Sequence, residues 1–206
     1  MRTYMTLICL FGISGLFAQW SDSFSQSLDP AWKGDVHNFK VNSQMQLQLM
    51  APSAGSSALF RSFQYEDSLV WSFYIKLDFS PSATNKLAVV LIADQMPWDS
   101  SKAFYIEIGE NGTNDNWKFF YKDASTKQLL GSGELMQLAS DPAMARFNIS
   151  LYQDSIWNFK VNYTGEYPLN LERTLFKQIP FKKDSCFLNL FVRTQIRVKI
   201  DTILMM

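Results

Sequence analysis

Residues 69–79 read LVWSFYIKLDF, and this stretch decides the fold. Apolar side chains occupy every second position, at Trp71, Phe73, Ile75, Leu77 and Phe79. Consecutive side chains of a β-strand point to opposite faces, so this spacing produces one apolar face and one mostly polar face. A helix would scatter the same five residues around its circumference. The stretch therefore predicts a β-strand that lies over a hydrophobic core.

Similar short apolar runs recur along the chain and are separated by turn residues, most clearly in GENGTNDN at 109–116. The predicted strands span residues 38–42, 45–50, 58–63, 69–79, 87–93, 103–108, 117–122, 128–133, 146–152, 156–163, 187–193 and 197–204, with Phe24 opening a further one. Only 134–143 is expected to hold a helical turn. About a dozen short strands are typical of a sandwich or barrel, and bulky inward aromatics favour two packed sheets. The prediction is an all-β, two-sheet antiparallel sandwich of jelly-roll type.

The first residues have the pattern of a signal peptide. Arg2 supplies the positive charge, residues 5–17 are apolar, and Ala18 precedes the predicted cleavage site. We therefore expect residues 1–18 to be removed and 19–206 to form one domain, secreted or at the cell surface, with the periplasm as an alternative. Cleavage removes Cys9 and leaves Cys186, which opens the apolar run CFLNLFV. A buried, inert thiol and no internal disulfide are expected.

The composition excludes several classes of protein. Of 206 residues, 47% are hydrophobic and 15% aromatic, while only 18% are charged, which indicates a packed domain. Lys plus Arg and Asp plus Glu are equal at 19 each, so no net positive field favours nucleic acid. After residue 18 no window is long and apolar enough for a membrane span. The expected partners include neither nucleic acid nor a bilayer.

Four segments carry a resemblance to a known family. They are WSDSFSQSLDPAWKGDVHNFKVNSQMQLQL from Trp20, WSFYIKLDFSPSATN from Trp71, AFYIEIGENGTNDNWKFFYKD from Ala103 and VKIDTI from Val198. Together they resemble the N-terminal β-sandwich of exported Bacteroidota proteins, a laminin-G-like or concanavalin-like jelly roll that precedes lamin-tail or adhesion repeats. The resemblance implies a secreted, non-catalytic module with an adhesive or structural role, joined to other domains of a longer parent chain.

Catalytic patterns are weak. One histidine, His37, leaves too few ligands for a zinc site. A Ser–His–Asp triad would have to use His37, and no G-x-S-x-G elbow occurs after residue 18. Glycosidases on jelly rolls need two facing carboxylates, for which the family pattern is E-x-D-x-x-E. Glu107 and Glu110 are the nearest match, but the central Asp is absent and their odd spacing places them on opposite faces of a strand. We therefore expect no enzyme, and a glycoside hydrolase is the third-ranked alternative.

The main alternative to an adhesive module is a glycan-binding module. Trp98, in a proline-containing loop, and Tyr74 and Tyr105, on the polar phase of their strands, are candidate sugar platforms, with Glu107 beside Tyr105. The competing interpretation is that these aromatics pack under loops.

Loop oxygens suggest one candidate cofactor, calcium. Asp94, Asp115 and Asn116 are the candidate ligands, with Asp99 and Asn114 in the same loops. Asp and Asn also favour turns for local reasons, so turn formation is the competing interpretation.

Overall fold

The computed structural model describes residues 20–25, 27–65, 68–112, 114–123, 126–180, 186–193 and 203–205. Within these ranges the only helices are two short 3₁₀ turns, η1 (Val36–Asn38) and η2 (Trp98–Ser100). No helix in this part of the chain has the length and apolar character needed to cross a bilayer. The predicted signal peptide at 1–18 lies outside the described residues, as does most of the strand predicted at 197–204.

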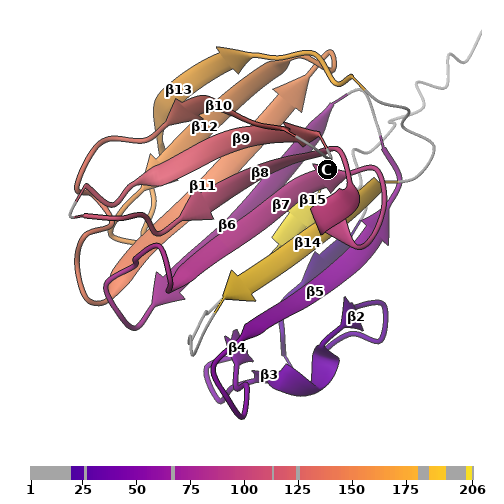
Figure 1. The fold of residues 1–206 in the computed structure, drawn as a ribbon, viewed down its shortest axis with the longest axis vertical. Coiled ribbons are helices and arrows are strands. Elements are labelled where there is room, and N and C mark those ends of the chain that lie inside the picture. Colours follow the sequence, from indigo (N-terminus) through magenta and orange to yellow (C-terminus); the bar gives the residue numbers. More distant parts are fainter. Residues whose placement is uncertain are drawn as a thin grey trace, which may run out of the picture.

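Two antiparallel sheets face each other and form a sandwich (Figure 1). The six-stranded sheet runs in the order β1 (Trp20–Asp22), β15 (Ile203–Met205), β6 (Leu69–Leu77), β11 (Ala143–Tyr152), β12 (Ile156–Asn162), β13 (Asn170–Phe176). The seven-stranded sheet runs β10 (Thr126–Ser132), β9 (Trp117–Asp123), β8 (Ala103–Ile108), β7 (Lys86–Ala93), β14 (Cys186–Arg193), β5 (Ser56–Phe63), β2 (Lys33–Gly34). A separate hairpin joins β3 (Phe39–Val41) to β4 (Leu47–Leu49). The predicted fold class is confirmed.

Strand β6 has the phase that its alternation predicts. Trp71, Phe73, Ile75 and Leu77 are all 1% exposed or less. Their neighbours on β11 are apolar as well, because Phe147 lies opposite Phe73, and the two rings stack with centroids 5.2 Å apart. Such cross-strand aromatic pairs stabilise a sheet on its buried face. β6 is therefore a central strand of the six-stranded sheet, in contact with the core on one side only.

Aromatic rings from both sheets meet in the middle of the sandwich. Trp157 of β12 stacks on Phe104 of β8 with centroids 5.0 Å apart, and on Trp71 of its own sheet at 5.8 Å. Phe159 of β12 contacts Phe119 of β9 at 4.8 Å. Burying one such ring contributes roughly 1.5–3 kcal/mol. This layer joins the two sheets into one core.

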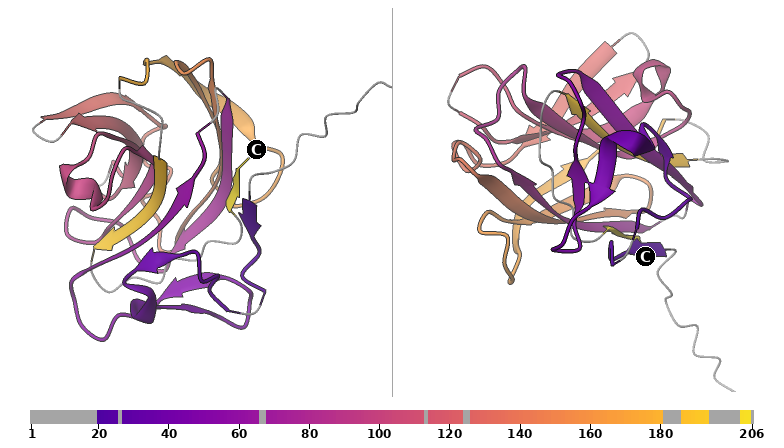
Figure 2. Two further views of the ribbon diagram at one scale, coloured as in Figure 1. Left: turned by 90° about the vertical axis from the view of Figure 1, so that its right-hand side faces the viewer. Right: turned by 90° about the horizontal axis from the view of Figure 1, so that it is seen from below.

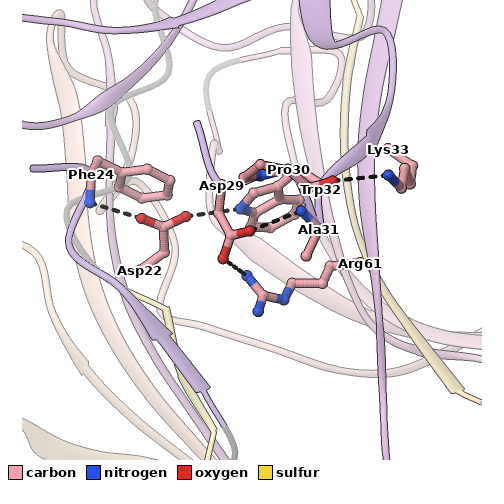
Figure 3. A network of polar contacts seen from close by, with 8 residues as sticks. All are labelled: Asp22, Phe24, Asp29, Pro30, Ala31, Trp32, Lys33 and Arg61. Atoms are coloured by element: carbon pink, nitrogen blue, oxygen red, sulfur yellow. Dashed lines mark hydrogen bonds and ion pairs between the residues drawn. The ribbon is translucent and has the colours of Figure 1, made fainter. Parts of the chain in front are cut away.

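The segment after β1 crosses the open end of the sandwich, where a buried carboxylate fastens it (Figure 3). Asp22 accepts a hydrogen bond from the Phe24 backbone N–H at 2.9 Å and another from the Trp32 Nε1 at 3.0 Å. The Trp32 ring is itself buried. Phe24 was expected to open a strand. It instead follows β1 as a buried residue with a φ of 49°, and its backbone N–H donates back to Asp22 where a continuing strand would bond a neighbouring strand.

A second carboxylate continues the same fastening to the seven-stranded sheet (Figure 3). Asp29 accepts from the Ala31 backbone N–H at 2.8 Å and pairs with the Arg61 guanidinium of β5 at 2.7 Å. The hydrogen bond from Ala31, with that from Arg61, lowers the pKa of Asp29. The entry segment is thus tied to β1 of one sheet through Asp22 and to β5 of the other through Asp29.

Two further segments differ from the prediction made from the sequence. The sequence predicts no strand between residues 163 and 187, yet β13 forms there and pairs with β12. Its exposure pattern shows no alternation, because it is an edge strand held by backbone hydrogen bonds more than by an apolar face. Residues 135–138 form a turn without a helix, and Leu138 reaches the core from it. Cys186 is buried, as expected.

Replacement of Trp157 by Ala is expected to lower the free energy of unfolding by roughly 3–5 kcal/mol, because it empties the centre of the aromatic layer. Urea denaturation measures the change. The matched control is Tyr152→Ala at the end of the adjoining strand, where the side chain is 44% exposed. That variant should stay within about 0.5 kcal/mol of the parent protein. Equal losses in both variants would contradict the central role of the layer.

Candidate functional site

The outer face of the seven-stranded sheet is covered at its centre. The segment that contains η2 lies against this face (Figure 2), and as a result Leu87 to Ala93 of β7 are buried on both sides. A second apolar cluster forms there, apart from the main core. Its members are Ala88, Val90, Ala93, Trp98, Ala103, Tyr105 and Phe120. The strand predicted at 87–93 is confirmed as β7.

Trp98 is the residue that closes this cluster. Its indole packs edge-on against Tyr105 with centroids 5.2 Å apart, and Tyr105 stacks on Phe120 at 5.3 Å. The Lys122 ammonium lies 4.5 Å from the Trp98 ring centroid and donates to the backbone oxygens of Trp98 and Asp99. Trp98 is 9% exposed and Tyr105 only 2%. Packing therefore accounts for most of the surface of both aromatics.

The accessible edge of Trp98 lines a pocket of about 400 Å³. The pocket lies between the β2–β5 edge of the sheet and the η2 segment. Its lining comprises Gly34, Asp35, Ala58, Phe60, Met96, Pro97, Trp98 and Asp99. The walls are aromatic and aliphatic, and two aspartates, Asp35 and Asp99, are among the lining residues.

Local structure fixes the β2 wall of this pocket. Asp35 Oδ2 accepts from the Ala58 backbone N–H at 2.9 Å, which holds the turn after β2 against β5. Gly34 has a φ of +101°, and a Cβ at this position would collide with the Ala58 carbonyl oxygen. Only glycine is compatible with that close approach. Phe60 lies on the outer face beside it, a residue that sequence reasoning missed because Leu59 and Phe60 are both apolar and leave the strand's phase open.

Glu107 lies on the same outer face, next to the aromatic cluster. Its carboxylate pairs with the Lys86 and Lys127 ammonium groups, each at 3.1 Å, and its side chain is 15% exposed. Lys118 lies directly opposite Glu107 on β9 and pairs with Glu110. The in-phase neighbours of Glu107 on β8 are Ala103 and Tyr105, so the strand offers no second carboxylate on this face. Among the described residues of β8, Glu107 therefore has no carboxylate partner of the kind that pairs in glycoside hydrolases.

Tyr74 lies on the opposite side of the molecule from the other three predicted ligand residues. It is on the outer face of β6, beneath Gly165, at which any added Cβ would meet the Tyr74 ring. The Arg146 guanidinium lies 5.3 Å from the Tyr74 ring centroid and 4.9 Å from that of Tyr167. The outer face of the seven-stranded sheet thus carries Trp98, Tyr105 and Glu107. Tyr74 packs on the outer face of the six-stranded sheet.

The three predicted metal ligands do not come together. Asp94 follows β7 and accepts from the Lys102 backbone N–H at 2.9 Å. Asp115 and Asn116 precede β9, at the other end of the sheet. Through the intervening strand β8, Ala93 at the end of β7 is level with Lys122 near the end of β9, and Leu87 is level with Trp117 at its start. Six residues of strand span roughly 20 Å. Consecutive hairpin loops lie at opposite ends of a sheet, and this rule would have separated the three residues at the sequence level.

Asp115 and Asn116 alone form a small polar site. Both are 2% exposed, and the Oδ1 of each has no hydrogen-bond partner among the described residues. Asn116 donates through Nδ2 to the Gly133 carbonyl at 3.0 Å. Burial raises the pKa of Asp115, with a backbone hydrogen bond from Glu110 opposing the effect. In the described part of the chain, no three His, Cys, Asp or Glu side chains gather. Two oxygens fit only part of the six to eight that calcium takes.

Comparison with known proteins identifies the fold. No protein-family model and no curated protein sequence matches the chain. Among solved structures, the carbohydrate recognition domain of Emp47p superposes with a TM-score of 0.61 at 10% identity, covering 91% of this chain and 93% of that one. The exoplasmic/lumenal domain of VIP36, bound to Ca²⁺ and Man3GlcNAc, has a TM-score of 0.64 at 10% identity and covers 90% and 87%.

A hydrolase shares the same architecture. A glycosyl hydrolase family 16 protein from Mycobacterium smegmatis superposes with a TM-score of 0.58 at 14% identity and covers 92% of this chain and 100% of that one. Identities this low show the fold alone, a concanavalin-like β-sandwich, as the resemblance implied. Fold does not decide between binding and catalysis, which depend on the site.

Asp115→Asn is expected to stabilise the protein at neutral pH. The raised pKa of Asp115 means that the native state favours the protonated carboxyl. The contribution of that carboxyl to the free energy of unfolding is fully present below its usual pKa of 3.8, and it is lost as the pH rises through the raised pKa of the native state. Asn is uncharged at every pH, so the variant does not lose stability at this position as the pH rises. Urea denaturation should show a gain near pH 7 that disappears near about pH 3. A variant that is less stable at pH 7 would contradict this account.

Calcium is expected to leave the melting temperature unchanged, because the Asp115–Asn116 pair supplies too few ligands. Thermal melts of the parent protein in calcium and in chelator provide the measurement, and Asp115→Asn serves as the matched variant. A rise with calcium in the parent that is absent from the variant would overturn the expectation and assign the site to a cation.

Proposed function

We propose that the chain is a non-catalytic glycan-binding module whose site is the pocket between Phe60 and Trp98. The pocket itself carries the proposal, because it joins two aromatic walls to the carboxylates of Asp35 and Asp99. A pyranose ring has an apolar C–H face and a rim of hydroxyl groups. The aromatic walls suit the first, and carboxylate acceptors suit the second.

The size and position of the pocket support this role. Small-molecule sites are concave, of ~300–1,000 Å³, and mostly apolar with a few placed polar groups. At about 400 Å³ the pocket is within this range. The Phe60 ring also makes an edge-on contact with Phe187 at 6.3 Å, so this wall is supported by the neighbouring strand. A side chain that is already held in place loses little conformational entropy when a ligand binds against it.

The descriptions of three similar domains support a binding role. The similar domains of Emp47p and VIP36 are described as a carbohydrate recognition domain and as bound to Man3GlcNAc, and a similar phage Dit domain is described as a CBM2 module, with a TM-score of 0.61 at 9% identity. In this chain Glu107 is held by two lysines and has no facing carboxylate on its own strand. That arrangement favours recognition of a sugar without its hydrolysis.

The signal-peptide pattern at 1–18 supports export, so the glycans within reach are those of a cell surface or an extracellular polymer. An adhesive role, implied by the family resemblance, follows from the same activity. In a longer chain, such a module holds its other domains at a polysaccharide.

Phe60→Ala is expected to weaken glycan binding about tenfold, the equivalent of ~1.4 kcal/mol, because it removes one wall of the pocket. A glycan array selects the ligand, and titration calorimetry measures the affinity. Trp98→Ala should have at least the same effect, with melting curves to confirm that the variant folds, and Asp99→Asn tests the rim without touching the apolar cluster.

The matched control is Tyr167→Ala, which removes an aromatic ring that is 66% exposed on the opposite side of the molecule. Its affinity should equal that of the parent protein. An array without any bound glycan, or losses of affinity that are equal in Phe60→Ala and Tyr167→Ala, would refute the proposed site.

A further inference from the structure

Four lysines lie on the outer face of the seven-stranded sheet beside the Trp98 cluster. They are Lys86, Lys118, Lys122 and Lys127. Carboxylates accompany them, because Glu107 pairs with Lys86 and Lys127, Glu110 pairs with Lys118, and Asp99 lies near Lys122.

Two of these lysines face each other across neighbouring strands. Lys127 of β10 lies directly opposite Lys122 of β9. Like charges in this position destabilise a sheet, and the contacts of Lys127 with Glu107 and of Lys122 with the Trp98 and Asp99 backbone oxygens hold the two lysines in place against that repulsion. Burial and the charge of Lys127 both lower the pKa of Lys122, against the influence of Asp99. A ligand anion between the two ammonium groups would relieve that repulsion.

The lysine pair adjoins the proposed sugar pocket through Trp98. Lys122 lies over the Trp98 ring, whose other edge lines the pocket. Lys127 lies 3.8 Å from the Phe120 ring centroid, and its side chain is 44% exposed. It donates to Glu107 at 3.1 Å, which leaves two of its three N–H donors for other acceptors.

We propose that the module recognises acidic glycans, with a carboxylate or sulfate group bound between Lys122 and Lys127 while a neighbouring sugar occupies the Phe60–Trp98 pocket. The inference rests on the proposed glycan binding and adds the chemical class of the ligand. Lys127 is assigned to the position although it also pairs with Glu107, because its side chain is 44% exposed, whereas those of Lys86 and Lys118 are 23% and 29% exposed.

The test compares three oligosaccharides of equal length: a galacturonate hexamer, a sulfated galactan hexamer and an unmodified galactan hexamer. Titration calorimetry on the full chain at ~0.05 M and ~1 M NaCl measures each affinity, since salt screens exposed charges. The acidic ligands should bind more tightly than the neutral one and lose that advantage at high salt. Whichever acidic ligand binds more tightly identifies the anion as a carboxylate or a sulfate.

Lys127→Gln should weaken binding of the preferred acidic hexamer about tenfold and leave the neutral hexamer unaffected. Lys122→Gln should weaken binding of the acidic hexamer more than that of the neutral one, because Lys122 also donates to the backbone oxygens of Trp98 and Asp99 in the pocket lining. Lys160→Gln, an exposed lysine of β12 on the six-stranded sheet, is the charge-matched control and should change neither. Melting curves confirm that each variant is folded.

Equal, salt-independent affinities for all three hexamers, unchanged in the lysine variants but reduced in Phe60→Ala, would overturn the acidic-glycan inference and leave the glycan-binding proposal in place. Absence of binding to these hexamers and to every member of the glycan array would overturn both.

Discussion

The structure depends on contact between aromatic rings of the two sheets. Trp157 stacks on Phe104, and Phe159 packs against Phe119, so strands that share no backbone hydrogen bonds are held together by side chains alone. The order of strands within each sheet follows from backbone pairing, but the distance between the sheets follows from these rings. The rigidity of the pocket wall has the same origin, since β8 carries Phe104 inward and Tyr105 outward on consecutive residues.

Aromatic packing also organises the outer face of the seven-stranded sheet. Most antiparallel sheets expose one face to water. Here the η2 segment brings Trp98 over Tyr105, so the centre of the seven-stranded sheet is covered and only its margins stay open. The Phe60 pocket is at one margin and the lysine pair is at another. The η2 segment therefore determines which parts of this face are covered and which parts are accessible to the proposed ligand.

Strands with a strong apolar alternation were predictable from the sequence. The segments that cover the outer faces of the sheets were not. Trp71 to Leu77 alternate so regularly that sheet, phase and burial could all be predicted, and Glu107 is on the outer phase as expected. The burial of β7 on both faces was also predictable, but not that Trp98 provides its second side. β13 was missed because an edge strand needs no apolar periodicity. The site residues Gly34 and Phe60 owe their role to long-range pairing between β2 and β5, which no local pattern encodes.

The pairing of β1 with β15 has a consequence for how the module is displayed. These are the first and last described strands, and they lie side by side in the six-stranded sheet. The η2 segment is on the far side of the sandwich from them (Figure 2), and the pocket residues Ala58 and Phe60 belong to the seven-stranded sheet. The first and last described strands are therefore on the sheet that does not carry the pocket. The proposed site can be approached without passing either of these two strands.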